Sequence, residues 1–501
     1  VIQMNTLVET RFGKVQGGTD GEVCFWKGIP YAKPPVGKRR FQKPEPPEKW
    51  DGVWEATRFR SMVMQPSGTT FSTVLGEADL PVSEDGLYLN IWSPAADGKK
   101  RPVLFWIHGG AYQFGSGASP WYDGTEFAKN GDVVVVTINY RLNAFGFLYL
   151  ADWFGDEFSA SGNLGILDQV AALRWVKENI SAFGGDPEQI TIFGESAGAG
   201  SVGVLLSLPE TKGLFQRAIL QSGSGAILLR SSQTASGIAE QILTKAGIRK
   251  GDRDRLLSIP AGELLEAAQS VNPGMVFGPV VDGTVLKTHP IEALETGAAG
   301  DIPIIIGVTK DEYNLFTLTD PSWTTAGKEE LMDRIEQEIG PVPEKVFPYY
   351  LSFGDPSQPV WQKLLRAMTY HIFTRGMLKT ADAQIKQGGK VWVYRFDYET
   401  PLFDGRLKAC HALEIPFVFH NLHQPGVDVF TGTHSKRELI SRQMHEAWIA
   451  FARTGDPNGD HLPDAWLPFA QKDRPAMVFD TETRAEKHLF DREQELWESK
   501  A

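Results

Sequence analysis

Short runs of apolar, mostly β-branched residues alternate along the chain with stretches whose apolar residues recur at helical spacing. Runs of strand length without polar alternation are typical of strands that are covered on both faces. From Ile166 to Ile180, apolar residues recur every three or four positions, which predicts a helix that ends at Gly184. Strands that alternate with helices predict a mostly parallel sheet with right-handed crossovers. The predicted strands are 103–107, 133–138, 190–193, 218–220, 302–308 and 391–396.

The pattern of region 323–387 is mostly helical. Apolar residues repeat every four positions from Leu331 to Ile339, and a second amphipathic segment follows. This predicts a helical insertion beside or above the carboxyl ends of the strands, with ordinary crossover helices as the alternative. A last helix is predicted over 437–453. We expect all of these elements to form one domain over residues 1–501.

Composition restricts the class of protein. Of 501 residues, 42% are hydrophobic and 22% charged, as in a soluble globular protein, and no apolar run reaches the roughly 18–20 residues of a transmembrane helix. The net charge of -12 argues against nucleic acid or an anionic membrane surface as the main partner. The two cysteines, Cys24 and Cys410, allow one disulfide, but a secreted framework usually has more. The first residues lack a signal-peptide pattern, so we expect a cytoplasmic protein, with an already cleaved signal as the alternative.

One pentapeptide, Gly194-Glu195-Ser196-Ala197-Gly198, lies between a predicted strand and a small-residue stretch that is compatible with a helix. A serine at such a junction, with glycine two residues to either side, is typical of the nucleophile elbow of α/β-hydrolases. The tight turn strains the serine backbone, and side chains at the flanking positions would collide, so glycine fits both. The elbow would expose the Ser196 hydroxyl at the carboxyl edge of the sheet, where ligands bind.

A serine hydroxyl needs a base within hydrogen-bond reach and an acid that orients the base. In α/β-hydrolases the acid and then the histidine follow the serine along the chain. His411 is the best candidate base because it lies in a loop after the predicted strand 391–396, although a structural role fits its pattern equally well. Asp311 and Glu312 both follow the predicted strand 302–308, and their position alone does not distinguish them.

Backbone N–H donors for a developing oxyanion are predicted at two places. The His-Gly-Gly-Ala segment 108–111 directly follows the predicted strand 103–107, and its glycines let the backbone approach a substrate carbonyl. The N–H of Ala197, just after the elbow serine, would join those of Gly109 and Gly110. The histidine that opens the segment is expected to support the loop rather than to act as a base.

Segments along almost the whole chain resemble the type B carboxylesterase family, the cholinesterase-like α/β-hydrolases. The branch of bacterial para-nitrobenzyl esterases, with carboxylesterases of thermophilic bacilli, is the most similar. This resemblance implies an α/β-hydrolase fold, a mostly parallel central sheet flanked by helices. Secreted eukaryotic members have a cysteine where this chain has Gly86, so the missing early disulfide fits an intracellular bacterial enzyme. The segments that carry the resemblance are 28–37, 83–92, 108–111, 163–201, 220–224, 307–313 and 409–419.

The resemblance also implies the role of each catalytic residue. Ser196 would be the nucleophile, His411 the base and Glu312, rather than Asp311, the orienting acid. The backbone donors described above would form the oxyanion hole.

Further residues are implied around this triad. Ser222 and Glu414 match family positions that hydrogen-bond around the catalytic histidine, and Glu195 faces the pocket. Leu315 and Phe316 follow the acid closely and would line the acyl or alcohol pocket. For Ser222, Glu414 and Glu195, the alternative role is hydrogen bonding within the core. For Leu315 and Phe316, the alternative is ordinary core packing.

Together these residues predict a serine carboxylic ester hydrolase that acts on small to medium uncharged esters through an acyl-enzyme. The ester and water would be its partners, no metal or organic cofactor is needed, and we expect a monomer. A lipase, a thioesterase or an amidase would use the same fold and chemistry. A non-catalytic binding protein of this fold would lack a triad member. A thiol enzyme based on Cys410 would leave Ser196 unexplained.

Overall fold

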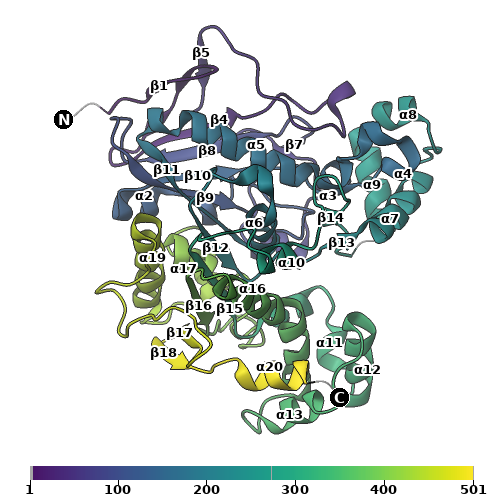
Figure 1. The fold of residues 1–501 in the computed structure, drawn as a ribbon, viewed down its shortest axis with the longest axis vertical. Helices are drawn as coiled ribbons and strands as arrows, with labels where there is room; N and C mark the ends of the chain where they lie inside the picture. Colours follow the sequence, from purple (N-terminus) through teal and green to yellow (C-terminus); the bar gives the residue numbers. More distant parts are fainter. Residues whose placement is uncertain (1–3, 272–273, 500–501) are drawn as a thin grey trace.

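The computed structural model describes residues 4–271 and 274–499, whose largest element is an 11-stranded sheet (Figure 1). In Figure 1 the N-terminal strands lie at the top and the C-terminal strands near the bottom. The order across the sheet is β18 (Arg484–Lys487), β17 (Pro475–Phe479), β16 (Val391–Phe396), β15 (Ile304–Thr309), β12 (Arg217–Gln221), β11 (Gly185–Glu195), β9 (Arg101–Ile107), β10 (Val134–Ile138), β8 (Tyr88–Ser93), β4 (Cys24–Pro30) and β3 (Gly18–Thr19).

The strands predicted from the apolar runs are β9, β10, β11, β12, β15 and β16, and they are parallel neighbours in the centre of the sheet. Both faces of these strands are covered. In β9, Val103 and Phe105 belong to one hydrophobic core, and Leu104 and Trp106 belong to the other. Because side chains alternate across a strand, a strand buried on both faces is apolar at every position. The predicted mostly parallel sheet is confirmed.

Helices cover both faces of the sheet. The predicted helix 166–180 is α5 (Leu164–Asn179), which packs in the core that contains Val103. The predicted helix 437–453 is α19 (Arg437–Thr454), which packs in the core that contains Trp106. The other helices up to residue 295 and after residue 400 are α1 (Thr70–Val74), α2 (Thr125–Gly131), α3 (Asn143–Phe147), α4 (Ala151–Phe154), α6 (Ala197–Ser207), α7 (Ser232–Lys245), α8 (Arg253–Ser258), α9 (Ala261–Val271), α10 (Pro290–Glu295), α17 (Ile415–Phe419), α18 (Val427–Thr431) and α20 (Asp491–Glu498).

The region predicted as a helical insertion is built from short helices, and a π-helical turn, Tyr370–Thr374, joins the last two of them. Figure 1 shows α11, α12 and α13 grouped at the lower right, on the side of the molecule where the C-terminal helix α20 ends. The helices of this region are α11 (Ser322–Thr325), α12 (Lys328–Ile339), α13 (Val346–Ser352), α14 (Val360–Leu364), α15 (Arg366–Thr369) and α16 (Arg375–Lys386).

Among the described residues, three small sheets lie outside the main one. Two of them contain only two short strands each. Their strands are β1 (Leu7–Thr10), β2 (Gly13–Gln16) and β5 (Val53–Glu55) in the first, β13 (Arg230–Ser231) and β14 (Val280–Val281) in the second, and β6 (Met62–Val63) and β7 (Val82–Ser83) in the third.

The structure also answers two questions that composition raised. Cys24 lies in β4 and Cys410 in the loop before α17, and both are buried and free, so the disulfide that their number allows is not formed. Within residues 4–271 and 274–499, no helix combines the length and the apolar character that crossing a membrane requires.

Candidate active site

Ser196 lies alone in the turn between the end of β11 and the start of α6. Its φ of 58° and ψ of -120° are a strained combination for a residue with a side chain. Its N–H donates to the Gln221 carbonyl of the neighbouring strand at 2.9 Å, which holds the turn. A Cβ on Gly194 would lie 2.5 Å from the carbonyl carbon of Gly198, and one on Gly198 would lie 2.0 Å from the Ile107 oxygen. The flanking glycines are therefore required by close backbone contacts on both sides of the serine.

The elbow opens into a cavity of about 1300 Å³. Ser196, Glu195 and His411 line this cavity, together with Gly110 and Ala111 from the loop after β9. The cavity wall is mixed, with apolar side chains and also charged ones such as Arg230, Glu292 and Lys379. Concave sites with polar groups among apolar side chains are typical of small-molecule binding. The apolar part of the wall includes Leu315 and Phe316, with Phe71, Ile227, Met368 and Phe373.

Glu312 and His411 meet although 99 positions separate them in the sequence. Glu312 Oε2 accepts a hydrogen bond from His411 Nδ1 at 2.6 Å, and Glu312 Oε1 accepts one from the Thr309 N–H at 2.8 Å. The Glu312 side chain is completely buried. The other ring nitrogen, His411 Nε2, lies 3.1 Å from Glu195 Oε2, and the ring packs 4.8 Å from that of Phe373. The carboxylate therefore sets the orientation of the imidazole and its tautomer, with the proton on Nδ1.

Asp311, the alternative acid, faces a different partner. One of its carboxylate oxygens accepts a hydrogen bond from the Ala409 N–H at 3.3 Å, and the other lies 3.7 Å from Arg366 Nη1. Successive residues of the turn after β15 thus point to different neighbours. Of the two acidic residues, Glu312 is the one beside the imidazole.

Ser196 and His411 line the same cavity but do not touch through a hydrogen bond. Among the described residues, Ser196 Oγ has no hydrogen-bond partner, and Nε2 of His411 is instead close to Glu195. In an active site without substrate, such contacts are often long and shorten when the substrate binds.

The loop after β9 passes directly beside the serine. A Cβ built on Gly109 would lie 3.2 Å from the Cβ of Ser196. Within the ranges that the structure describes, neither the N–H of Gly109 nor that of Gly110 donates to another protein group. Ala197 is the first residue of α6, where backbone N–H groups have no partner inside the helix. Of the three predicted donors, Gly110 lines the cavity, Gly109 lies beside Ser196 in space, and Ala197 follows it in the chain.

His108 supports this loop from behind. Its Nδ1 donates to the Gly109 carbonyl at 2.6 Å, and its ring stacks on Tyr140 at 4.5 Å. The Tyr140 hydroxyl donates in turn to the His108 carbonyl at 2.6 Å. Burial lowers the pKa of His108 to about 4, so it is neutral near pH 7 and holds the backbone in place.

The three further polar residues that the resemblance implies, Glu195, Ser222 and Glu414, are all buried. Burial, with the nearby charges of Glu414 and Glu312, raises the pKa of Glu195 well above its usual value. Burial and Glu312 raise the pKa of Glu414 to about 8. Ser222 is completely buried just after β12, and neither it nor Glu414 is hydrogen-bonded to His411 among the described residues. Within those residues, no group of three or more His, Cys, Asp or Glu side chains is placed to hold a metal ion.

Phe373 is a contact of His411 that the sequence pattern did not reveal. It lies in the π-helical turn Tyr370–Thr374, and such turns are frequent at functional sites. In the sequence, this segment has the apolar spacing of an ordinary amphipathic helix. Spacing shows that a face is apolar, but it does not distinguish a core contact from a cavity wall.

The mostly parallel sheet, with a strained serine between strand and helix at its carboxyl edge, is the α/β-hydrolase fold. Residues 4–497 match the model of the carboxylesterase family, and the chain belongs to that family. It is accordingly an enzyme that hydrolyses carboxylic esters, and the resemblance inferred from the sequence is confirmed.

Relatives cover the chain almost from end to end. The para-nitrobenzyl esterase of Bacillus subtilis (strain 168) is 41% identical over 491 residues, which are 96% of this chain and 96% of that protein. The phenmedipham hydrolase of Pseudarthrobacter oxydans is 35% identical and covers 94% of each chain. The crystal structure of the Geobacillus stearothermophilus carboxylesterase EST55 at pH 6.2 is 65% identical, with a TM-score of 0.93 over 99% of this chain and 100% of that one.

Proposed function

We propose that this carboxylesterase hydrolyses small to medium uncharged esters through an acyl-enzyme on Ser196, with His411 as the base and Glu312 as the orienting acid. The observation that carries the proposal is the 2.6 Å contact between buried Glu312 and His411, in a cavity that Ser196 also lines. A histidine that is oriented by a carboxylate, in the same cavity as a serine, is the arrangement that activates a hydroxyl nucleophile.

Acylation begins when substrate brings Ser196 Oγ within reach of His411 Nε2. The Oγ proton moves to Nε2 while Oγ bonds to the ester carbonyl carbon, and the carbonyl oxygen becomes an oxyanion. Glu312 stabilises the resulting imidazolium through Nδ1. The N–H groups of Gly109, Gly110 and Ala197 stabilise the oxyanion, and each donor lowers the barrier by about 3–4 kcal/mol.

The tetrahedral intermediate then collapses. Its bond to the alcohol oxygen breaks, and His411 Nε2 returns its proton to that oxygen, so that the alcohol leaves and Ser196 carries the acyl group. A water molecule gives a proton to His411 and attacks the acyl carbon. Collapse of the second intermediate releases the carboxylic acid and restores the serine hydroxyl.

The cavity supports the substrate class. Its wall includes Leu315, Phe316 and Phe373, which would receive apolar acyl or alcohol groups. The rival based on Cys410 is disfavoured because burial raises the pKa of that thiol well above its usual value, which suppresses the reactive thiolate. The region 323–387 is proposed as a lid-like part of a single domain over residues 1–501. A monomeric state and a cytoplasmic location in a bacterium stay predictions.

Covalent labelling tests the nucleophile. Incubation with diethyl para-nitrophenyl phosphate, followed by intact mass measurement and peptide mapping, should give one phosphoryl adduct per chain at Ser196, with loss of ester hydrolysis. Ser196→Ala should give no adduct and no hydrolysis. Ser207→Ala, at the other end of the same helix, should behave like the unmodified protein. An adduct elsewhere, or hydrolysis retained in Ser196→Ala, would contradict the proposal.

A further inference from the structure

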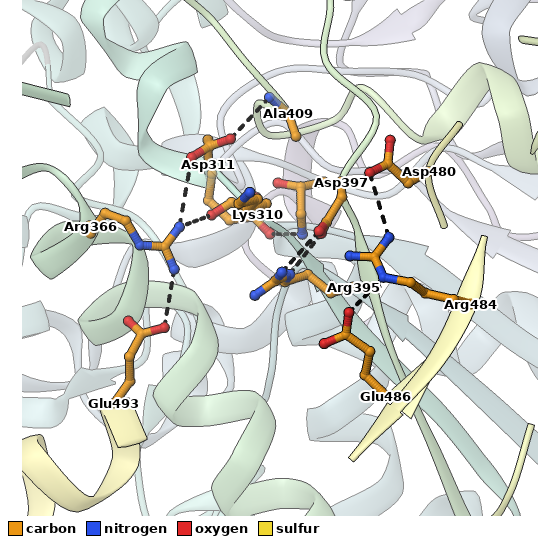
Figure 2. Close-up of polar contacts among 12 residues, drawn as sticks. Lys310, Asp311, Arg366, Arg395, Asp397, Ala409, Asp480, Arg484, Glu486 and Glu493 are labelled. Carbon is orange, nitrogen blue, oxygen red and sulfur yellow. Dashed lines mark hydrogen bonds and ion pairs between the residues drawn. The ribbon is translucent and has the colours of Figure 1, made fainter. Parts of the chain in front are cut away.

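Arg366 in α15 lies between two acidic side chains beside the carboxyl end of β15 (Figure 2). Its Nη2 is 3.1 Å from Glu493 Oε1, and its Nη1 is 3.7 Å from Asp311 Oδ1. Nη1 also donates to the Lys310 carbonyl at 2.8 Å. The three charged side chains are 11–21% exposed, so solvent screens their interactions only partly. One guanidinium therefore joins the turn after β15 to the C-terminal helix α20.

Asp311 connects this ion-pair group to the loop that carries His411. Its N–H donates to the Ala409 carbonyl at 2.9 Å, and its Oδ2 accepts from the Ala409 N–H at 3.3 Å. Two residues further on, the His411 N–H donates to the Glu312 carbonyl at 3.3 Å. The turn that carries the acid and the loop that carries the base are thus joined by backbone contacts and by the Asp311 carboxylate. Figure 2 shows this carboxylate between Arg366 and Ala409.

The positive charge of Arg366 favours the ionised form of Asp311, which accepts the hydrogen bond from the Ala409 N–H. Burial raises the pKa of Asp311, and the guanidinium of Arg366 opposes that rise. An ionised carboxylate accepts the Ala409 N–H more strongly than a protonated carboxyl does.

Glu493 ties the group to the C-terminal helix. Glu493 Oε2 accepts from the Tyr350 hydroxyl at 2.6 Å, and the Trp497 indole N–H donates to the same hydroxyl at 3.0 Å. The position of Arg366 therefore depends on α20 as well as on the turn after β15.

We propose that Asp311, Arg366 and Glu493 form a positioning relay that holds the His411 loop at the spacing from Glu312 which catalysis requires. None of the three touches the reacting atoms. The relay acts through the Ala409 backbone. Through Glu493, the C-terminal helix α20 therefore helps to hold His411 in place. This inference rests on the proposed roles of Ser196, His411 and Glu312.

The test compares kcat and KM for a para-nitrophenyl ester in Arg366→Met and Arg366→Lys. Displacements of catalytic groups by about 1 Å cost about 100-fold in rate, so Arg366→Met should lower kcat by about 10–100-fold while KM stays within about threefold. Arg366→Lys keeps the positive charge but lacks the planar fork that reaches both carboxylates, so its kcat should lie between that of Arg366→Met and that of the unmodified enzyme. A merely structural role would change the melting temperature without this separation of kcat from KM.

Arg484 provides a matched control. It lies at the same end of the sheet and forms ion pairs with Glu486 at 2.6 Å and Asp480 at 3.8 Å (Figure 2). It also donates a hydrogen bond to the Glu482 carbonyl. Among the described residues it has no contact with Ala409. Arg484→Met should keep kcat within about twofold of the unmodified enzyme. An equal loss of kcat in this control would overturn the proposal.

The relay and the proposed function fail in different ways. If diethyl para-nitrophenyl phosphate does not label Ser196 of the unmodified enzyme, the proposed function fails, and the relay fails with it. If Ser196 is labelled but Arg366→Met keeps the full kcat, or Arg366→Lys recovers nothing, only the relay is overturned. Should Arg366→Met not fold, Glu493→Gln keeps the side-chain shape and removes one charge. It should then lower kcat by about 3–10-fold, and an unchanged kcat would overturn the relay.

Discussion

Replacement of Glu312 by glutamine tests the acid with little change of shape. The Gln carbonyl can still accept the Thr309 N–H, which lies 2.8 Å from Glu312 Oε1, so the turn should persist. The amide would present N–H donors to His411 Nδ1, which favours the tautomer with the proton on Nε2. That tautomer cannot accept the proton of Ser196. Glu312→Gln therefore removes both the charge and the correct tautomer.

The structure gives the size of the effect. An ion pair at the observed 2.6 Å contact is worth about 6 kcal/mol at an effective dielectric constant of about 20, and about 4 kcal/mol if the delocalised charges are about 4 Å apart. The imidazolium exists only after the proton transfer, so this energy is lost from the transition state. We expect kcat to fall by about 10³–10⁴-fold, with KM nearly unchanged.

Steady-state hydrolysis of para-nitrophenyl butyrate measures both parameters, and circular dichroism checks the fold. Asp311→Asn is the matched comparison, because it makes the same chemical change one residue earlier. It should lower kcat by only about tenfold, since Asp311 acts through Ala409. If Asp311→Asn loses about a thousandfold while Glu312→Gln loses less than tenfold, the acid has been assigned to the wrong residue.

Three further changes test the loop, the buried carboxylates and the core. Gly109→Ala would place a Cβ 2.6 Å from the Glu195 carbonyl oxygen and displace an oxyanion donor. The kcat should therefore fall by about 10²–10³-fold, and a fall of only a few-fold would contradict the role of Gly109 in the oxyanion hole. The pKa of Glu414 is about 8 in the folded protein and 4.5 in the unfolded chain, so between these pH values the folded protein binds more protons. The free energy of unfolding should therefore fall by about 1.4 kcal/mol for each unit by which the pH rises. Buried Glu195, whose pKa is also raised, adds a slope of the same sign, so Glu414→Gln should reduce the total slope by about that amount in urea titrations at several pH values. An unchanged slope would exclude Glu414 as a contributor. Asp168 forms an ion pair with buried Arg141 at 2.8 Å, so Asp168→Asn leaves the arginine without a counter-charge. The free energy of unfolding in urea should fall by about 3–5 kcal/mol, and a fall below about 1 kcal/mol would show that the site relaxes.

Local chemistry made much of the fold predictable. The central strands are apolar at every position because both of their faces are buried, so their runs stand out in the sequence. The ends are less definite: the predicted strand 302–308 is β15 at Ile304–Thr309, and the predicted strand 218–220 is β12 at Arg217–Gln221. Strand ends depend on hydrogen bonds to neighbouring strands, which the order of residues along one strand does not contain.

The elbow is predictable because Gly194, Ser196 and Gly198 are within five consecutive positions, so the motif stands out in the sequence. Part of its steric requirement comes from the neighbouring strand β9, since a Cβ on Gly198 would lie 2.0 Å from the Ile107 oxygen. The choice between Asp311 and Glu312 is different, because both follow the same strand. The residues alone left that choice open, and only the resemblance to a family favoured Glu312.

Buried strands, helix periodicity and the glycine-flanked serine are predictable from the sequence because each pattern lies in consecutive residues. Contacts between residues far apart in the sequence follow only from the tertiary structure. It brought Glu312 to His411 over 99 positions and Arg366 to Glu493 over 127 positions, and it turned Asp311 toward Ala409. Such contacts depend on which strands are neighbours and on where each loop returns to the sheet edge. Those are properties of the whole packed chain, in which residues far apart in sequence are buried together.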